Sequence, residues 1–551
     1  MRKASIGRAG VETDDVGGST LTELLETLVR EHGPRVALVE SGSGRALTFA
    51  ELRAAAGALA TDLAGRGVRR GDVVALWLPN VLEYLVWEFA LAALGAAALG
   101  VNTRYGEHEV THLLGRAAPV GVVLPFRFLG LDFTGKLAGA VRSGRVLAAA
   151  PWVCVVGAPD DAEAAGFDVG GGAHQAPDPT AAASAGLPGE GRADDPVAYF
   201  TTSGSTGAPK LPGHPQSAVV EHAWNVARTF DMRPGDAVHL ALPLCGVFGF
   251  SAAFGMLAAG GTCVLDPVFD PDRMARDVVA HRVTHLIGGD DMLGRLMATW
   301  LADPVEWPAC RRGAVADFGG RAAEVARWAE DRVGVALSGV YGASELFALI
   351  AAWPAEMPVA ERVRSGGVPV SRGIAVRAVD PESGSVCAAG TTGELQFRGY
   401  PVTAGYLGGP AVPVDEDGWF ASGDLGSTTD DGAFRFLCRA GDALRLHGFL
   451  VEPADIEVFL MAQEGVDTAK VVGAEAGNGL VAVAFVTLRP GAAVTASRLQ
   501  SRCRDELAGF KVPARIEVLD EFPVTTGTNG TKIRASELRE RAARLMSQAK
   551  A

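Results

Sequence analysis

Short apolar runs alternate along the first half of the chain with longer segments of helical periodicity. Leucines recur at helical spacing from Leu21 to Leu28, so we expect a helix that begins there and is capped by Thr20 or Ser19. Further helices are expected over residues 49–65, capped by Thr48, and over about 81–94. Short apolar strands are expected at residues 37–40, 72–78, 120–124 and 197–201. This alternation is typical of α/β proteins, in which helices cover a parallel sheet.

The pattern changes in the second half of the chain. Residues 157–196 hold almost no large apolar side chains and are expected to form a surface excursion. From residue 373 to about 436, short strands are separated by Gly and Pro, which predicts an antiparallel or barrel-like piece. These strands are expected at residues 374–379, 393–398 and 434–437.

The last part of the chain, after residue 439, mixes strands and helices. Strands at residues 470–472, 481–488 and 515–518 are expected to share one small sheet, and a helix should follow from residue 536 to about 546. We therefore expect an α/β fold with a large N-terminal domain of two α/β sheets and a β-barrel-like piece, residues 20–438. A small mobile α+β domain, residues 439–551, should follow it.

Two apolar stretches are long enough to be weighed as membrane spans, which need about 20 apolar residues. Residues 84–101 are apolar except for Glu88, but they are rich in Ala and end in a polar run, which favours a buried helix. Residues 244–265 carry no charge, but their five glycines favour a turn, a helix and a strand in series. We therefore expect no integral contact with a membrane.

The composition is that of a globular enzyme and excludes several other classes of protein. Of the 551 residues, 48% are hydrophobic and 21% charged, and the net charge of −14 argues against a general nucleic-acid-binding protein. The seven cysteines are odd in number and scattered, which favours a reducing compartment and so the cytoplasm. Residues 1–19 are polar and lack the apolar core of a secretory signal, so we expect a disordered tail.

A loop rich in hydroxyl groups follows the strand expected at residues 197–201. Its sequence is Thr201-Thr202-Ser203-Gly204-Ser205-Thr206-Gly207-Ala208-Pro209-Lys210. Glycines allow a loop to fold tightly around an anion, hydroxyls and backbone N–H groups donate to phosphate oxygens, and lysine adds positive charge. The loop lacks the spacing of a Walker motif, and by composition alone a polar surface loop is an equal alternative.

Four later motifs add groups that suit a nucleotide and its metal ion. They are Val340-Tyr341-Gly342-Ala343-Ser344-Glu345, Trp419-Phe420-Ala421-Ser422-Gly423-Asp424-Leu425, Cys438-Arg439-Ala440-Gly441-Asp442 and a Gly/Thr-rich loop that presents Lys532. A carboxylate such as that of Glu345, facing a phosphate loop, is a natural ligand of Mg²⁺. Asp424, in a tight turn, suits the two hydroxyls of a ribose.

In this order, the five motifs resemble those of the adenylate-forming superfamily, which comprises acyl-CoA synthetases, peptide-synthetase adenylation domains and luciferases. The resemblance is collinear from about Leu21 to Glu540. It implies that ATP and a carboxylic acid form an acyl-adenylate and pyrophosphate, and that the acyl group then passes to CoA. The cofactors implied are ATP, Mg²⁺ and CoA, and the similarity is greatest to fatty- or aryl-acid–CoA ligases.

The resemblance also implies a role for each motif residue. The phosphate loop would hold the β- and γ-phosphates through Thr202, Ser203, Gly204, Ser205, Thr206, Gly207 and Lys210. The rest of the nucleotide pocket would comprise Gly319, Gly320, Arg321, Gly342 and Tyr341, with Tyr341 stacked on adenine. Ser344 and Glu345 would contact the α-phosphate and Mg²⁺, with Thr206 as a second metal ligand, and Asp424 and Arg439 would hold the ribose. The catalytic residues implied are Lys532, Glu345, Arg439 and Lys210.

The C-terminal segment is expected to serve both half-reactions. Lys532 would bridge the substrate carboxylate and the phosphate, since a cation between two anions lowers the barrier to their reaction. In the superfamily the small domain then rotates and offers a thioester-forming face, which residues 442–457 resemble. There Gly448 would let the pantetheine arm of CoA pass, and Arg445 stands where lysine is usual. Gly441 at the hinge and Asn529-Gly530-Thr531 before Lys532 also depart from the usual pattern.

The acyl pocket is expected to be apolar. Its candidate lining residues are Cys245, Gly246, Phe248, Phe250, Phe318 and Phe347. The motif that contains Cys245 and Gly246 usually carries an aromatic residue or a histidine at these positions, so a larger pocket is expected here. Because no charged partner for an ammonium group is evident, fatty or aryl acids are favoured over amino acids.

Three hypotheses on function remain open. The first is a carboxylate–CoA ligase, and the second is a stand-alone adenylating enzyme that passes its acyl-AMP to a carrier protein or another nucleophile. The third is a non-catalytic nucleotide-binding homologue, which the motif residues argue against. The partners expected are a small carboxylic acid and CoA or a carrier protein, with the oligomeric state open between monomer and homodimer.

One further motif points to different chemistry. His108-Glu109-Val110-Thr111-His112 matches His-Glu-x-x-His, the helix signature of zinc proteases. The alternative is a solvated surface helix, and zinc would need a third ligand and an open site. We favour the surface helix.

Overall fold

The computed structural model describes residues 18–142, 152–156, 173–175, 186–201, 210–440, 444–446, 449–451, 453–476, 479–507, 509–527 and 530–548. The fold is mixed α/β, with a large N-terminal domain of sheets and a smaller C-terminal domain. The chain divides into two compact units. The first runs to Val268 and includes Ser344–Phe347 and Thr403–Val412, and the second comprises Phe269–Ala343, Ala348–Val402 and Pro413–Ala551. The expected boundary at residues 438 and 439 stays a prediction.

The first unit contains a sheet with the strand order β19-β9-β8-β4-β3-β5-β6-β7. The bounds are β3 Val73–Leu76, β4 Ala97–Gly100, β5 Gly121–Pro125, β6 Trp152–Val156, β7 Ala173–Gln175, β8 Pro196–Tyr199, β9 Pro212–Pro215 and β19 Gly405–Tyr406. The strands from β8 to β7 are parallel, whereas β9 and β19 are added antiparallel. The parallel part confirms the α/β pattern of the sequence.

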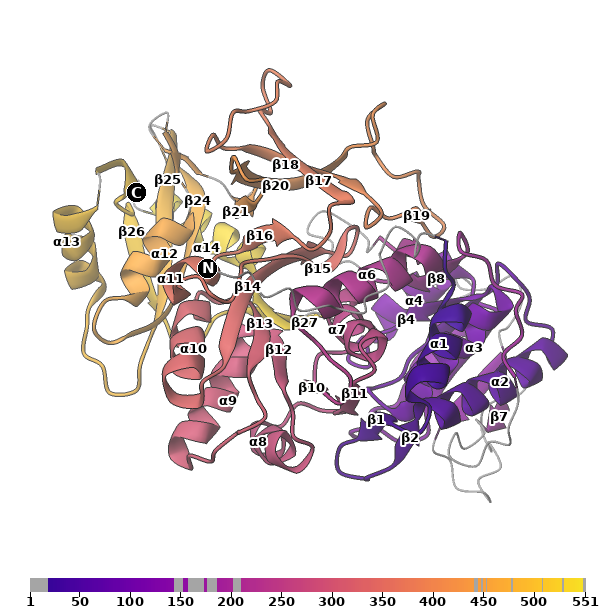
Figure 1. Cartoon of the computed structure of the whole chain (residues 1–551). Helices are drawn as coiled ribbons and strands as arrows, with labels where there is room; N and C mark the ends of the chain where they lie inside the picture. Colours follow the sequence, from indigo (N-terminus) through magenta and orange to yellow (C-terminus); the bar gives the residue numbers. More distant parts are fainter. Residues whose placement is uncertain are drawn as a thin grey trace, which may run out of the picture. The chain divides into compact units, whose positions relative to one another are not determined.

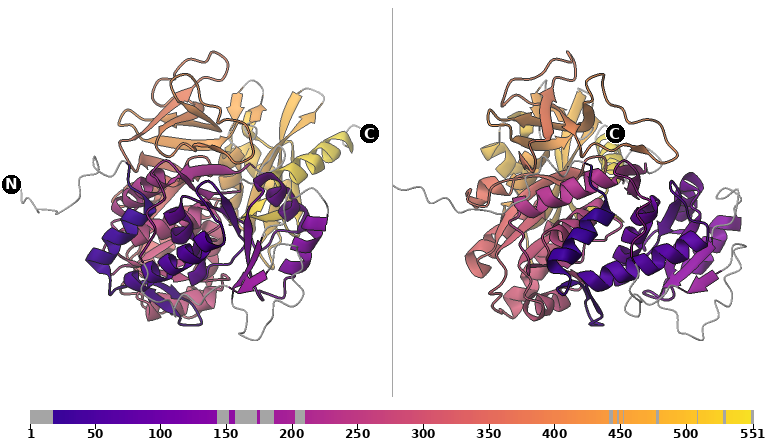
Figure 2. Two further views of the ribbon diagram at one scale, coloured as in Figure 1. Left: turned by 90° about the vertical axis from the view of Figure 1, so that its right-hand side faces the viewer. Right: turned by 45° about the vertical axis from the view of Figure 1, so that its right-hand side comes forward.

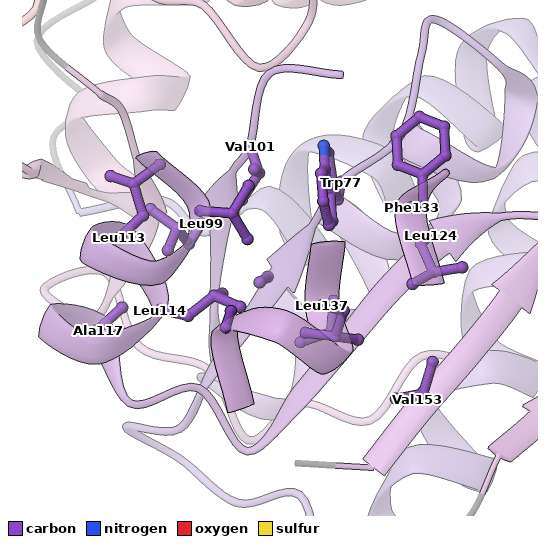
Figure 3. Close-up of a cluster of buried hydrophobic side chains, with 14 of the residues drawn as sticks. Trp77, Leu99, Val101, Leu113, Leu114, Ala117, Leu124, Phe133, Leu137 and Val153 are labelled. Atoms are coloured by element: carbon purple, nitrogen blue, oxygen red, sulfur yellow. The ribbon is translucent and has the colours of Figure 1, made fainter. Parts of the chain in front are cut away.

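Buried side chains pack two helices on this sheet (Figure 3). Trp77, just after β3, meets Phe133 of α5 (Phe133–Arg142) edge to face, with the ring centroids 5.0 Å apart. Leu113 and Leu114 of α4 (Glu107–Ala117) belong to the same buried cluster. Burial of these apolar faces fixes α4 and α5 to the sheet.

The first unit also holds strands in the order β10-β11-β1-β2. Their bounds are β1 Val36–Glu40, β2 Ala46–Thr48, β10 Ala237–Leu240 and β11 Thr262–Leu265. The other helices of this unit are α1 Leu21–His32, α2 Phe49–Gly65, α3 Leu82–Leu94, α6 Gln216–Thr229 and α7 Val247–Ala258. The helices α1, α2 and α3 lie beside one another in all three views (Figures 1 and 2).

Two predicted helices begin where the sequence marks their caps. Thr20 and Glu23 form a capping box at the start of α1, and Thr48 and Glu51 form another at the start of α2. In each box the threonine Oγ1 accepts from the glutamate backbone N–H, and the carboxylate accepts from the threonine N–H. The helix predicted over residues 49–65 is confirmed at both ends.

The second unit contains strands in the order β17-β18-β20-β21-β16-β15-β14-β13-β12, except that Phe347, the first residue of β15, belongs to the first unit. The bounds are β12 His285–Gly289, β13 Arg312–Ala316, β14 Ala336–Ala343, β15 Phe347–Ala352, β16 Gly366–Pro369, β17 Ile374–Val379, β18 Gly393–Gly399, β20 Phe420–Thr428 and β21 Phe434–Arg439. Strands β12, β13 and β14 are parallel, whereas the run from β17 to β16 is antiparallel, as the sequence predicts (Figure 1). The helices here are α8 Pro271–Ala280, α9 Asp290–Ala302, α10 Ala322–Trp328, the π-helix Ala329–Val333 and α11 Val359–Arg362.

The C-terminal segment forms one small sheet, as predicted. Strand β24 (Val466–Ala476) pairs antiparallel with β25 (Gly479–Leu488), which pairs parallel with β26 (Arg515–Leu519). Ile456 and Leu460 pack with Val471 in one buried cluster, and Leu538 packs with Phe485 in another. The remaining elements are β22 Leu444–Leu446, β23 Phe449–Val451, α12 Pro453–Met461, α13 Ala496–Glu506, the 3-10 helix Gly509–Lys511, β27 Val524–Gly527, β28 Gly530–Ile533 and α14 Ala535–Gln548.

The two apolar stretches form the elements that the sequence favoured. The first gives α3 and β4, and the second gives α7 and β11. Over the described ranges, no helix combines the length and the hydropathy that crossing a membrane requires. The expected tail, up to residue 17, and most of the excursion at residues 157–196 lie outside the described residues.

Candidate active site

The phosphate loop is described only at its two ends. Residues 202–209 lie outside the described residues, and with them Thr202, Ser203, Gly204, Ser205, Thr206 and Gly207. Strand β8 leads into the loop and β9 leads out of it, and the two strands pair antiparallel with Tyr199 opposite Gly213. Lys210, which is exposed, therefore lies on the return from this hairpin.

Lys210 and Glu345 both lie next to Tyr406, a residue that no sequence motif marked. The Lys210 Nζ is 5.3 Å from the centroid of the Tyr406 ring, and the Tyr406 hydroxyl donates to Glu345 Oε1 at 3.4 Å. Burial, followed by the neighbouring Glu345 carboxylate, raises the pKa of Tyr406. The first unit thus gathers a cation and a carboxylate around one phenol.

The backbone on both sides of Glu345 is held by hydrogen bonds. His214 Nε2 donates to the carbonyl oxygen of Ser344 at 2.8 Å, and the Thr403 N–H donates to the carbonyl oxygen of Glu345 at 2.8 Å. Burial lowers the pKa of His214 to about 4, so the imidazole is neutral near pH 7. His214 is a second residue that sequence reasoning missed.

Tyr341, Asp424 and Arg439 meet in the second unit. Strands β20 and β21 place Asp424 directly opposite Arg439, and the Arg439 Nε lies 3.0 Å from Asp424 Oδ1. The Tyr341 hydroxyl donates to Asp424 Oδ2 at 2.5 Å. Asp424 is buried and Arg439 is exposed, and the Asp424 carboxylate is held by one hydrogen bond and one ion pair. Burial and the Asp424 charge raise the pKa of Tyr341.

The Tyr341 ring packs among phenylalanines. Its centroid is 5.5 Å from that of Phe397, with the rings stacked, and 5.2 Å from that of Phe434, with the rings edge to face. Gly342, next along β14, is exposed. Stacking of Tyr341 on adenine stays a prediction.

Two carboxyl groups hold the loop that contains Gly319, Gly320 and Arg321. Asp290, at the start of α9, accepts from the backbone N–H groups of Phe318, Gly319 and Arg321 at 2.9–3.1 Å, and Asp317 accepts from that of Gly320 at 2.8 Å. Gly320 has φ +80°, which suits glycine. Although Asp317 is exposed as a residue, its carboxyl lies among atoms that desolvate it and next to Asp290. Both effects raise the pKa of Asp317 to about 7.

The candidate acyl-pocket residues fall into both units. In the first unit Cys245, Phe248 and Phe250 are buried, and Gly246 is the N-cap of α7, whose residues are all buried. Phe250 lies edge to face with Phe200 at 5.1 Å, and the ring of Phe347 stacks with that of His214 at 3.8 Å. Phe318 belongs to the second unit, on the loop that Asp290 holds.

The C-terminal candidates are described mainly by their backbone. Lys532 lies in the hairpin of β27 and β28, opposite Thr525, and its side chain lies outside the described residues. Arg445 lies in β22, opposite Leu450, again without a described side chain. Gly441 and Gly448 lie outside the described residues.

The His-Glu-x-x-His motif forms the first part of α4, as favoured above. The carboxylate of Glu109 accepts from the backbone N–H of Gly106 at 3.0 Å, which caps the helix. In the part of the chain that the structure covers, no group of three or more His, Cys, Asp or Glu side chains is arranged to hold a metal ion.

Comparison with known proteins adds evidence beyond this geometry. A family model described as "AMP-binding enzyme" matches residues 25–407, and one described as "AMP-binding enzyme C-terminal domain" matches residues 455–528. Feruloyl-CoA synthase from Amycolatopsis sp is 31% identical over 525 residues, which cover 92% of this chain and 96% of that protein. The 2-succinylbenzoate–CoA ligase of Geobacillus kaustophilus (strain HTA426) is 30% identical over 490 residues, covering 88% and 91%. Among solved structures, ATP-bound MatB from Rhodopseudomonas palustris shares the fold, with a TM-score of 0.80 at 24% identity over 96% of this chain and 100% of that one.

Proposed function

The chain belongs to the AMP-binding enzyme family, and from this membership we propose that it activates a carboxylic acid with ATP and joins the acyl group to CoA. In the first half-reaction a carboxylate oxygen attacks the α-phosphorus of ATP, and pyrophosphate leaves. In the second, the thiolate of CoA attacks the acyl carbon, and AMP leaves. The observation that carries the proposal is the match to relatives named CoA ligases, which extends over 92% of this chain and 96% of feruloyl-CoA synthase.

The second unit offers groups that fit the nucleoside part of ATP. Asp424 is held by Tyr341 and Arg439, so its carboxylate direction is fixed before a ligand binds. A carboxylate has about four acceptor positions, and that of Asp424 would accept from the two ribose hydroxyls. The Gly319–Gly320–Arg321 loop, fixed by Asp290, would border the same nucleotide.

The first unit offers groups that fit Mg²⁺ and the phosphates. Mg²⁺ is bound in proteins by one or two carboxylates together with phosphate oxygens. Glu345 is half-buried, and the bond from Tyr406 at 3.4 Å is weak enough to leave its carboxylate able to bind a cation. Mg²⁺ there would neutralise charge that develops on the phosphates. Lys210, on the other side of Tyr406, would add a second positive charge.

The acid is proposed to be apolar, of the fatty or aryl class. The side chains of Phe248, Phe250 and Phe254 on α7 are all buried, and no residue of α7 is charged. An acyl chain or ring that packs against such side chains loses its contact with water, which is favourable for apolar groups only. An ammonium group would be left without a counter-charge there.

Pyrophosphate release tests this proposal. The purified chain is given ATP, Mg²⁺ and a panel of fatty, aryl and amino acids, with and without CoA, and the products are identified by mass spectrometry. We expect pyrophosphate release that depends on a fatty or aryl acid, and an acyl-CoA product when CoA is present. Asp424→Asn should lower the rate, whereas the matched change Asp431→Asn, in an exposed turn, should leave it unchanged.

Other outcomes would each contradict a defined part of the proposal. Acyl-AMP as the end product, even with CoA, would indicate a carrier protein or another nucleophile as the acceptor. ATP binding without pyrophosphate release for any acid would indicate a non-catalytic homologue.

A further inference from the structure

The segment that carries Glu345 ends in a strained backbone conformation. Phe347 has φ +63°, in the left-handed region that bulky residues avoid. Such a conformation persists only where the surrounding structure holds it, and it occurs preferentially at functional sites. Residues 344–347 are contacted by His214, His222 and Thr403.

His214 contacts this segment at two points. Its Nε2 lies 2.8 Å from the carbonyl oxygen of Ser344, and its ring stacks on that of Phe347 at 3.8 Å between centroids, with 25° between the planes. His222 of α6 stacks on the same phenylalanine at 4.8 Å and 8°. His214 is fully buried, so its hydrogen bond to Ser344 and its ring stack on Phe347 are both shielded from water.

The proton on His214 is fixed by this arrangement. A carbonyl oxygen can only accept, so Nε2 carries the hydrogen and donates. Nδ1 is then the acceptor nitrogen, and it has no hydrogen-bond partner among the described residues. A neutral ring with one defined donor is the form that burial favours.

Thr403 completes the support from the other side. Its N–H donates to the carbonyl oxygen of Glu345, and its Oγ1 donates to the carbonyl oxygen of Gly213, the neighbour of His214, at 2.8 Å. Strand β9, at residues 213 and 214, is thus linked to residues 344–345 both through His214 and through Thr403. The backbone that carries the Glu345 side chain is fixed at two successive carbonyls.

We propose that His214 is a positioning residue that, through its hydrogen bond to the Ser344 carbonyl, sets the direction of the Glu345 carboxylate and thereby the affinity of the site for the divalent cation of ATP. This rests on the proposed function, in which Glu345 is the metal ligand. When the bond is lost, the strained segment relaxes away from the positive φ of Phe347, and the Glu345 side chain turns with it. The stack on Phe347 can hold an aromatic ring at position 214, but a ring without an N–H group cannot donate to the Ser344 carbonyl.

Two substitutions separate the hydrogen bond from the stack. His214→Phe keeps an aromatic ring of similar size without a donor. His214→Gln keeps an N–H donor at the reach of Nε2 without an aromatic ring. The matched control is His112→Phe, which changes a half-buried histidine of α4 in the same unit.

The main readout is binding of Mn²⁺, followed by electron paramagnetic resonance in the presence of a non-hydrolysable ATP analogue. We expect H214F to weaken Mn²⁺ binding about tenfold, the order of effect of partners that orient a metal ligand. H214Q should stay within about twofold of the unsubstituted protein, by the same reasoning. In the adenylation assay, H214F should need correspondingly more Mg²⁺ for half its maximal rate, with the KM for the acid unchanged.

The outcomes decide between a positioning role and a merely structural one. If folded H214F binds Mn²⁺ as tightly as the unsubstituted protein, the proposal is wrong. A tenfold loss of Mn²⁺ affinity in folded H214Q would also overturn it. If H214F does not fold, the H214Q result alone decides. Should the unsubstituted protein release no pyrophosphate with any acid, the proposed function fails, whereas the Mn²⁺ measurement still tests His214.

Discussion

At the scale of single residues, Glu88 lies in an environment that disfavours its charged form. It lies in the middle of α3, its side chain is 1% exposed, and its Oε2 has no hydrogen-bond partner among the described residues. Burial raises its pKa well above the ordinary value of 4.5. The folded chain therefore holds this carboxyl as a neutral acid.

This gives a prediction on the pH dependence of stability. Above about pH 4.5 the unfolded chain releases the proton of Glu88 while the folded chain retains it, so the free energy of unfolding falls as the pH rises. Glu88→Gln removes that ionisation. We expect the stability of E88Q, relative to the unsubstituted protein, to increase from about pH 5 to about pH 8 in urea unfolding experiments. Glu464→Gln, at an exposed site, is the control, and a pH-independent difference for E88Q would contradict the prediction.

At the scale of elements, the helix starts depend on local side-chain caps. Thr48 and Glu51 satisfy N–H groups at the start of α2 that have no partner within the helix. The same hydrogen bond from the Thr48 backbone lowers the pKa of Glu51. Thr48 and Glu51 are three residues apart, so the cap requires no contact with a distant part of the chain.

Loss of the cap is expected to destabilise the protein modestly. Thr48→Ala should lower the free energy of unfolding by about 1 kcal/mol, the usual effect of removing an N-cap side chain. Thr61→Ala is the matched control, since it makes the same substitution at an exposed site within α2, where the hydroxyl bonds only to the Gly57 carbonyl. If chemical denaturation shows the same loss of unfolding free energy for both variants, the stabilisation attributed to the cap is wrong.

At the scale of the whole molecule, family models match two separate segments, residues 25–407 and residues 455–528. Lys532 follows the second segment, in the hairpin of β27 and β28. In the proposed reaction it brings a positive charge between two anions only during adenylation. In the second half-reaction the thiolate attacks the uncharged acyl carbon and not an anionic phosphate group.

Lys532→Ala should therefore separate the two half-reactions. We expect pyrophosphate release to fall by at least about a hundredfold, the size of loss seen when one charge-stabilising donor is removed. Transfer of the acyl group from supplied acyl-AMP to CoA should stay near its original rate. Lys511→Ala tests a second lysine of the C-terminal segment and should change neither rate. Equal losses in both half-reactions for K532A would contradict the role proposed for this lysine.

The sequence by itself determined the elements and the order of the motifs. Apolar periodicity and the Thr48 cap gave both ends of α2, and alternating apolar runs gave the three strands of the C-terminal sheet. These features are local, since the spacing of side chains along a few turns decides which face can be buried. The collinear motifs pointed to the family that the comparisons then identified.

Only the tertiary structure decided which side chains meet. Tyr406 reaches Glu345 across 61 residues, and His214 reaches Ser344 across 130. The register of β20 on β21 sets Arg439 opposite Asp424, and Tyr341 reaches that pair across 83 residues. A local pattern shows that a residue is buried or capped, but it does not contain the pairing of distant strands. Contacts of this kind arise from the packing of whole elements, and for that reason the residues that orient Glu345 and Asp424 became visible only in the folded chain.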